Sequence, residues 1–552
     1  MDVQIKLYRN KWISGNGIHS IGWASTPDTC YPDKAFHQFI ESQIDPNTFG
    51  ADDAYQLANT LNGSYALVIT THQSVFLIAD RTRSYPLIYL KNKGVLYITD
   101  DFLSLKADYV LKPTVDISQA ETFLLSSLTF GNHTIYKEVF GIQAAEIVEL
   151  SKQNETAKSK RYFRYTLNTE NKQQLITKEE INKQNEIFAH VFQRMSDSAP
   201  TVHNWIVPLS GGHDSRMIIN QIHKLGIKNV ICFSYGEVNN RQAQLSQRVA
   251  NALGYPWYFV EYTAEKWYQI RQTADFNRYF DFAFNGISNP HIQDLLAVYE
   301  LNKQGVFHPD DIFVPGHTFD FITGSQCLRN IKELQSEKDV INYLRYCINQ
   351  WSYKTRPKHL LKEITDMIRQ TPLPYNNFTE YFYWQEWHCK FLLNSVRVYE
   401  YFGFDWRAPL WDQELVKYWQ SLHVDYKLYR NFLYECEQQG LYNEPLRSIP
   451  FDFQMNPKAR TIDKLLRLIP YTFIRKIKHY IRPQAIHLDD GLHHVYAHQK
   501  TILKDQATYN SCPKALQNYL KPYKNRPLCW FPDNDNNSMY ALREQFKQKV
   551  FS

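Results

Sequence analysis

Hydrophobic and polar positions follow a short-range, strand-like pattern over the first 165 residues of the chain. Runs rich in β-branched and aromatic residues are separated by polar or glycine-containing breaks, which predicts strands. The clearest four are "SYALVITT" (64–71), "SVFLIADR" (74–81), "GVLYITDD" (94–101) and "AEIVELS" (145–151). The segment "DDAYQLANTLNG" (52–63) has helical spacing and ends at a glycine. We therefore expect a sheet-rich α+β domain over residues 1–165.

From about residue 176 the pattern changes to buried-type strands that alternate with amphipathic helices. Such alternation with short connections predicts right-handed βαβ units and a parallel sheet. The last predicted strand lies within 310–324, and the chain beyond it reads as mainly helical. The predicted strands are "NWIVPLS" (204–210), "KNVICFSYG" (228–236) and "YPWYFVEY" (255–262), and the helices between them are "DSRMIINQIHKLG" (214–226) and "NRQAQLSQRVANALG" (240–254).

Amino-acid composition and charge exclude several classes of protein but do not indicate a particular function. The chain has 552 residues, 43% of them hydrophobic and 21% charged, which is typical of a soluble protein of several domains. A formal net charge of +6 is small for this length and gives no support to nucleic acid as a partner. The eight cysteines have no CxxC pair or zinc-finger spacing, and no apolar run is long enough to span a bilayer. A cytoplasmic protein is therefore expected.

The loop "SGGHDS" (210–215) carries the strongest chemical signal. A strand that ends in Ser-Gly-Gly and enters a helix aims backbone N–H groups at an anion, and the helix dipole adds to the attraction. The loop matches neither a Walker A motif nor a dinucleotide-binding GxGxxG motif. Asp214 would repel a phosphate unless a cation lay between them, so Mg²⁺ is the simplest companion. The alternative is a capped glycine turn that binds nothing.

Several segments resemble the asparagine synthetase family. "LSGGHDS" (209–215) resembles its pyrophosphate-loop signature SGGxDS, and "VPGHTFDFITG" (314–324) resembles its glycine–x–x–x–Asp segment. "YEYFGFDWRAPLWDQELVKYW" (399–419) is similar to a run near the end of its synthetase domain, and residues 61–89 look like its glutaminase-type domain. The resemblance implies an Ntn-hydrolase-like sheet sandwich over 1–165. It implies an adenine-nucleotide α-hydrolase-like parallel sheet with helices over 176–455, followed by a basic helical extension over 456–552.

The same resemblance implies a set of site residues. Asp214 and Asp320 would hold Mg²⁺ on the pyrophosphate of ATP. His317 stands where relatives carry a glutamate or a tyrosine, and an imidazole with an ordinary pKa near ~6.5 can take a proton at neutral pH, so we expect it to act as general base, oriented by Glu386. The alternative is a histidine that hydrogen-bonds the loop. No lysine aligns with the family's pyrophosphate-contacting lysine, so Arg447 is expected to supply that charge. The residues expected to bind ATP and its pyrophosphate are Leu209, Ser210, Gly211, Gly212, Asp214, Ser215, Phe233, Ser234, Gly236, Pro315 and Gly316.

One departure from the family changes the expected activity. Relatives that hydrolyse glutamine use a cysteine as the mature N-terminal residue, whereas this sequence starts Met1-Asp2 and has its first cysteine at Cys30. We therefore expect no glutaminase activity, and an amide ligase that joins an activated carboxylate to ammonia or to an amine of a small molecule, peptide or glycan. The alternatives are a degenerate nucleotide-binding protein and an intramolecular cyclase of the β-lactam or lasso-peptide type.

A basic amphipathic segment follows the predicted synthetase domain. Residues 457–482 place lysines and arginines among large apolar residues, a pattern that allows contact with an anionic membrane surface, although Pro470 would interrupt a continuous helix. A core helix with one solvated basic face would have the same pattern.

Overall fold

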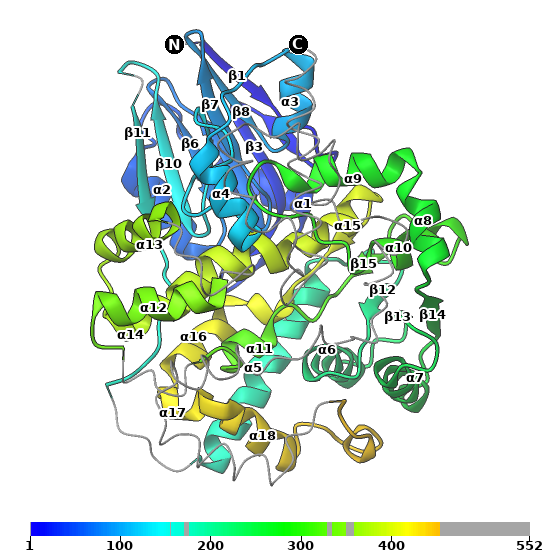
Figure 1. Cartoon of the computed structure of the whole chain (residues 1–552). Helices are drawn as coiled ribbons and strands as arrows, with labels where there is room; N and C mark the ends of the chain where they lie inside the picture. The colour runs from blue at the N-terminus through cyan, green and yellow to red at the C-terminus, as the bar shows by residue number, and fades with distance from the viewer. Residues whose placement is uncertain (1, 155, 171–175, 328–333, 349–357, 453–552) are drawn as a thin grey trace.

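The computed structural model describes residues 2–154, 156–170, 176–327, 334–348 and 358–452. Two parts follow one another along the chain, and Figure 1 shows the N-terminal sheets above and the helix-rich second part below. The predicted extension over 456–552, with its basic segment 457–482, lies outside the described residues. No helix in the described ranges is long and apolar enough to cross a membrane.

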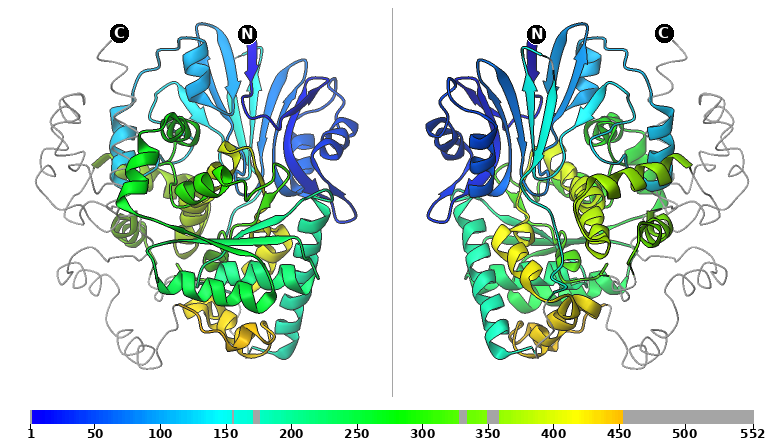
Figure 2. Two further views of the ribbon diagram at one scale, coloured as in Figure 1. Left: turned by 90° about the vertical axis from the view of Figure 1, so that its right-hand side faces the viewer. Right: turned by 90° about the vertical axis from the view of Figure 1, so that its left-hand side faces the viewer.

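The N-terminal part contains two β-sheets that pack against each other, as the two side views show (Figure 2). The four-stranded sheet has the order β1-β8-β7-β9, and the larger sheet has the order β11-β10-β6-β5-β3-β2 with β4 paired to β3. The strands are β1 (Asp2–Lys6), β2 (Ile13–Gly15), β3 (Ile18–Ser25), β4 (Cys30–Tyr31), β5 (Asn62–Thr70), β6 (Ser74–Ala79), β7 (Ile88–Asn92), β8 (Val95–Thr99), β9 (Val139–Gly141), β10 (Glu146–Ser151) and β11 (Ala157–Arg161).

Four helices accompany these sheets. They are α1 (Asp33–Ser42), α2 (Ala51–Thr60), α3 (Phe102–Asp108) and α4 (Ile117–Ser126). Helix α2 ends at Thr60, three residues before the predicted glycine stop. Gly63 instead lies within β5, where an added Cβ would come within 2.3 Å of the Trp23 carbonyl oxygen on β3. This glycine allows two strands to approach closely and does not end a helix.

The second part is built around a five-stranded parallel sheet of order β14-β13-β12-β15-β16. Its strands are β12 (Trp205–Pro208), β13 (Val230–Gly236), β14 (Trp257–Glu261), β15 (Ile312–Phe313) and β16 (Asp405–Trp406). The chain moves outward from β12 to β14 and then returns to the other side of β12 with β15. The carboxyl ends of β12 and β15 therefore form the switch point at which parallel sheets bind ligands.

Helices surround this sheet, and α6 and α7 are seen nearly end-on at the lower right of Figure 1. The helices before and within the sheet are α5 (Lys178–Asp197), α6 (His213–Lys224), α7 (Arg241–Leu253), α8 (Ala264–Arg271), α9 (Ala274–Phe284), α10 (Leu295–Lys303) and α11 (Phe319–Ile322). The later α-helices are α12 (Glu337–Ile348), α13 (Lys358–Gln370), α14 (Tyr375–Phe382), α15 (Arg397–Tyr401), α16 (Gln413–Ser421), α17 (Val424–Lys427) and α18 (Asn431–Gln438). The single-turn or irregular helices are η2 (Tyr383–Leu392), η3 (Leu393–Val396), η4 (Pro409–Trp411), η5 (Leu428–Arg430) and η6 (Leu446–Ser448).

The structure confirms the multidomain α+β and α/β architecture with a parallel sheet. Helix α7 ends at Gly254, which has the left-handed φ of 75° expected of a glycine stop. The pattern missed β16, because a strand of two residues has no periodicity to read. The assignment of the N-terminal sandwich to the Ntn-hydrolase class stays a prediction.

Polar contacts join the two parts. Asn62 at the start of β5 donates to the Asp412 carboxylate of the second part at 3.0 Å, and Arg194 on α5, also in the second part, donates to both oxygens of that carboxylate at 2.9 and 2.8 Å. The N–H of Phe102 on α3 donates to the side-chain oxygen of Asn285, which follows α9. Direct hydrogen bonds therefore hold the sheet sandwich against the helical part.

Candidate active site at the carboxyl edge of the parallel sheet

The glycine-rich loop leaves β12 at the centre of the parallel sheet and enters α6. The Ser210 and Ser215 hydroxyls lie 3.0 Å apart, and the N–H of Ser210 donates to the Ser215 hydroxyl at 3.0 Å. The Gly212 N–H donates to the Ser210 hydroxyl at 3.2 Å. These bonds shape the loop from within, while the first turn of α6 leaves N–H groups that an α-helix cannot satisfy internally. The loop can therefore accept an anion at the helix N-terminus.

Asp214 and Asp320 meet at this edge although 106 positions separate them in the sequence. The N–H of Asp320, in the first turn of α11, donates to Asp214 Oδ2 at 2.9 Å. Asp320 Oδ2 in turn accepts the Ser325 hydroxyl at 2.9 Å. Two neighbouring carboxylates supply the hard oxygen ligands that Mg²⁺ prefers, so this pair fits the expected magnesium site.

Arg430 is the cation that the structure places beside this pair. Its Nη2 lies 3.5 Å from Asp214 Oδ1, and its Nε donates to the Thr323 hydroxyl at 3.1 Å. Nothing in the pattern around "KLYRN" marks this arginine, since its contact depends on the packing of η5 beside α11. Its guanidinium therefore adds positive charge beside Asp214.

Burial, and then the charge of Asp320, raise the pKa of Asp214 to about 7, and Arg430 offsets part of this. A carboxyl that keeps its proton in the folded state to a higher pH than in the unfolded state stabilises the fold at low pH. That contribution is lost between about pH 4 and about pH 7. In EDTA, the free energy of unfolding of the wild type should therefore fall over this range more than that of Asp214→Asn. Urea titrations at both ends of the range measure the difference, and equal slopes would contradict it.

His317 lies on the same segment as Asp320 and is partly buried. Its Nε2 is 2.6 Å from the Ser395 hydroxyl on η3. Burial lowers its pKa, while the charges of Asp294 and Asp320 act in the opposite direction. Burial therefore favours the neutral imidazole at neutral pH, which is the form that accepts a proton. Asp294 itself accepts the Tyr235 hydroxyl at 2.7 Å and the Tyr399 hydroxyl.

Glu386 and Arg447 do not take the positions expected for them. Glu386 is 1% exposed on η2, where it pairs with Lys390 at 2.5 Å and accepts the Gly131 N–H at 3.3 Å. Ser395, not Glu386, is the hydrogen-bond partner of His317. The exposed Arg447 donates to the Gln438 carbonyl at 3.2 Å. Because Glu386 pairs with Lys390, it does not orient His317 as predicted. The role of Arg447 toward phosphate stays a prediction.

The remaining predicted residues divide between backbone and core positions. Leu209 is buried, and its N–H donates to the Phe233 carbonyl at 2.8 Å, which holds the loop to β13. The Phe233 ring is fully buried among other aromatic rings, so only its backbone can face a nucleotide. Ser234 is also buried, and Gly236 ends β13 with a left-handed φ of 124°. Their contact with a nucleotide stays a prediction.

Segment 449–452 covers the loop, a contact that no local pattern in the sequence predicts. Arg216 on α6 donates to the carbonyls of Ile449 and Pro450 at 2.6 and 2.8 Å. The Phe451 ring stacks on His213 with centroids 4.0 Å apart, and the Asp452 N–H donates to the Gly211 carbonyl at 3.0 Å. Gly211 is thus required for the close approach of Asp452 and α7, in addition to any role toward phosphate.

Gly316 is packed directly on the loop. A Cβ added there would lie 2.9 Å from the Ser215 nitrogen and 3.1 Å from the Asp214 carbonyl carbon, both backbone atoms that cannot move aside alone. We expect Gly316→Ala to lower the free energy of unfolding by about 1–3 kcal/mol and to weaken ATP binding. Gly50→Ala is the matched control, since its Cβ would meet nothing nearer than 3.8 Å. Equal urea midpoints for both variants would refute this account of Gly316.

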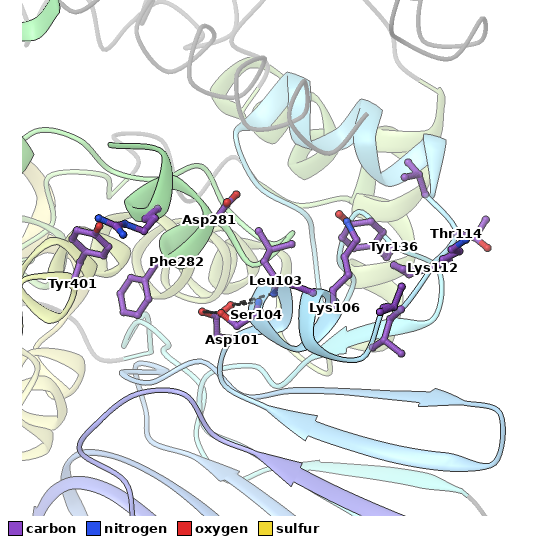
Figure 3. A pocket seen from close by; sticks show the side chains of 16 residues that line it. Asp101, Leu103, Ser104, Lys106, Lys112, Thr114, Tyr136, Asp281, Phe282 and Tyr401 are labelled. Atoms are coloured by element: carbon purple, nitrogen blue, oxygen red, sulfur yellow. Dashed lines mark hydrogen bonds between the residues drawn. The ribbon is translucent and has the colours of Figure 1, made fainter. Parts of the chain in front are cut away.

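A cavity of about 790 Å³ lies away from this edge, where α3 meets the end of α9 (Figure 3). Leu103 and Lys106 of α3 line one side, and Asp281 and Phe282 of α9 line the other. Asp101 is tied to the Ser104 hydroxyl at 2.9 Å, as the N-cap of α3. None of its lining residues comes from the loop or from the segment of Asp320, so size alone does not make this cavity the active site.

Comparisons with known proteins give only distant likenesses. No protein-family model matches the chain, and no curated protein matches it. Among solved structures, an NH3-dependent NAD synthetase from Campylobacter jejuni is 15% identical, with a TM-score of 0.19, over 26% of this chain and 60% of that one. An NMN synthetase from Francisella tularensis is 14% identical, with a TM-score of 0.19, over 38% and 93% of the two chains. A glutamine-dependent NAD+ synthetase from Acinetobacter baumannii is 13% identical, with a TM-score of 0.18, over 72% and 71%.

The chain thus spans 60% of the length of the first of these structures. At such identities and TM-scores we draw no conclusion about this chain from them. The assignment of function depends on the geometry of the loop and of the two aspartates.

Proposed function

We propose that this protein is an ATP-dependent amide ligase that resembles asparagine synthetases and releases pyrophosphate and AMP. One observation carries the proposal: the glycine-rich loop after β12 and the Asp320 segment after β15 converge at the switch point, where the Asp320 N–H bonds Asp214. An anion-binding loop and a pair of carboxylates suit a magnesium pyrophosphate. ATP would be the substrate that supplies it, through attack of a substrate carboxylate on its α-phosphate.

The proposed reaction has two steps, and different residues would act in each. In the first, the N–H groups of the loop and the first turn of α6 would orient the departing pyrophosphate, with Arg430 adding positive charge. Asp214 and Asp320 would hold Mg²⁺, which neutralises charge on the leaving group. In the second, His317 would take a proton from the attacking amine, while Ser395 fixes the orientation of its ring.

Exchange of labelled pyrophosphate into ATP, measured across candidate carboxylates, tests the first step. Exchange that depends on one carboxylate and on Mg²⁺ would support a ligase. ATP binding without exchange for every carboxylate would instead support the degenerate nucleotide-binding protein. A single substrate that carries both carboxylate and amine and loses water during turnover would indicate the cyclase.

His317 is expected to matter only after the carboxylate is activated. His317→Gln should slow amide formation about 100-fold and leave pyrophosphate exchange within a factor of about three, because the proton is removed in the second step. The two rates are measured on the same preparation, with the carboxylate that supports pyrophosphate exchange. His190→Gln is the control, since that exposed histidine pairs with Glu414 at the surface, away from the glycine-rich loop. Equal loss of both rates in His317→Gln would assign the histidine to binding.

A further inference from the structure

A second group of ligand-type side chains lies at the opposite edge of the parallel sheet. His203 and Asn204 directly precede β12, while His308 and Asp311 directly precede β15. Because β12 and β15 are parallel neighbours, residues before them lie at the amino edge, and the glycine-rich loop lies at the carboxyl edge. This group is therefore separate from the proposed active site.

The three potential ligands are close to one another. His203, His308 and Asp311 can each offer one ligand atom such that all three atoms lie within 4.8 Å of one another. His203 Nδ1 is 3.2 Å from Asp311 Oδ1, and the two imidazole rings stack with centroids 4.1 Å apart. Both histidines are exposed, whereas Asp311 is 1% exposed, so the carboxylate forms the floor of a site open to solvent.

Hydrogen bonds hold these residues in place before any ligand binds. The backbone N–H of His203 donates to the Asp310 carbonyl at 3.2 Å, and the backbone N–H of Ile312 donates to the Asn204 carbonyl at 3.0 Å. The backbone N–H of His308 donates to Asp311 Oδ2 at 2.8 Å, so the other carboxylate oxygen, Oδ1, faces His203. The two loops are thus fixed relative to each other by the strands that follow them.

One side-chain amide bridges His203 and Asp311. Asn204 Nδ2 lies 2.7 Å from His203 Nδ1 and 3.0 Å from Asp311 Oδ1. When Nδ1 of His203 carries no proton, the two amide hydrogens of Asn204 satisfy both of these acceptors. The imidazole and the carboxylate thus direct lone pairs to neighbouring positions, and a metal ion bound to both would replace these two hydrogen bonds.

We propose that His203, His308 and Asp311 bind Zn²⁺. Two imidazoles and one carboxylate are a ligand set that zinc uses, at about 2.0–2.2 Å from the metal, with a fourth position left for water. Ligand atoms around one such ion lie about 3.3 Å apart, so the present atoms would have to approach one another by no more than about 1.5 Å. The ion would cross-link the loops that lead into β12 and β15, and these strands carry the proposed active site at their other ends.

Zinc binding to the full chain tests the proposal directly. After dialysis against EDTA, titration with zinc chloride should show about one equivalent bound and a higher melting temperature. His203→Gln and His308→Gln should each weaken zinc binding at least ~10-fold. Both side chains are exposed, so circular dichroism should show unchanged folding. Cobalt substitution should add visible absorption bands that both variants lose.

Two controls separate this site from other histidines. His190→Gln changes an exposed histidine elsewhere on the described surface, and His493→Gln with His494→Gln changes a pair near the end of the sequence. Both controls should bind zinc like the wild type. Absence of zinc binding, or binding that His203→Gln and His308→Gln leave unchanged, would overturn the proposal. Neither result depends on ligase activity, so the zinc site and the proposed function can fail separately.

Discussion

Asp214→Asn should lower ATP–pyrophosphate exchange by about 10³-fold, and Asp320→Asn should do the same. Each substitution keeps the size of the side chain and removes one negative oxygen from the pair that meets at the switch point. The loss follows from electrostatics, because a departing pyrophosphate needs a divalent cation, and one remaining carboxylate binds that cation weakly. Exchange is measured at saturating ATP over a range of Mg²⁺ concentrations.

A partial rescue would show that the metal is involved. If the aspartates hold Mg²⁺, raising its concentration should recover part of the lost exchange in Asp320→Asn. Asp52→Asn is the matched control, since this carboxylate is 95% exposed and lies 3.4 Å from Lys160 at the surface. Wild-type exchange in Asp214→Asn would remove the main support for the proposed function.

Lys390→Met should lower the free energy of unfolding by about 3–5 kcal/mol. Lys390 and Glu386 are 2% and 1% exposed and lie 2.5 Å apart, so removing the lysine leaves a buried carboxylate without its partner. Burial raises the pKa of Glu386 and lowers that of Lys390, and each partner opposes the shift of the other. Urea unfolding followed by tryptophan fluorescence measures the effect.

The same lysine joins the two parts of the chain. Its Nζ also donates to the carbonyls of Thr129 and Gly131 in the N-terminal part, at 3.0 and 2.5 Å. We therefore expect limited proteolysis of Lys390→Met to release the N-terminal part more readily than in the wild type. This structural role, and not the catalytic one predicted from the sequence, accounts for Glu386.

An exposed pair of the same spacing is the control. Lys362 and Asp366 lie four residues apart on α13, with the lysine 73% exposed, and such pairs contribute about 0.3–0.5 kcal/mol. Lys362→Met should therefore change stability little. Adding Glu386→Gln to Lys390→Met should recover part of the loss, because the buried charge is gone. A cost for Lys390→Met no larger than for Lys362→Met would contradict this view of the pair.

Local pattern was sufficient to place most of the regular elements that form the site. The run at 204–210 became β12, the run at 214–226 became α6, and Gly254 ended α7 as expected. These elements are set by hydrophobic spacing and by glycine stops, which act within a dozen residues. The two-residue strand β16 and the strand role of Gly63 were missed, because both depend on a neighbouring strand distant in sequence.

The sequence by itself determined a glycine-rich loop between a strand and a helix, and two acids on separate segments that could flank a magnesium ion. Only the tertiary structure decided that Asp320 bonds Asp214, that Arg430 stands beside them, and that Glu386 belongs to a buried pair. It also brought His203 and His308 together across 105 positions. The sequence gives the chemistry of each side chain directly. The distance between two residues far apart in sequence is set by strand order and packing, which local periodicity does not predict.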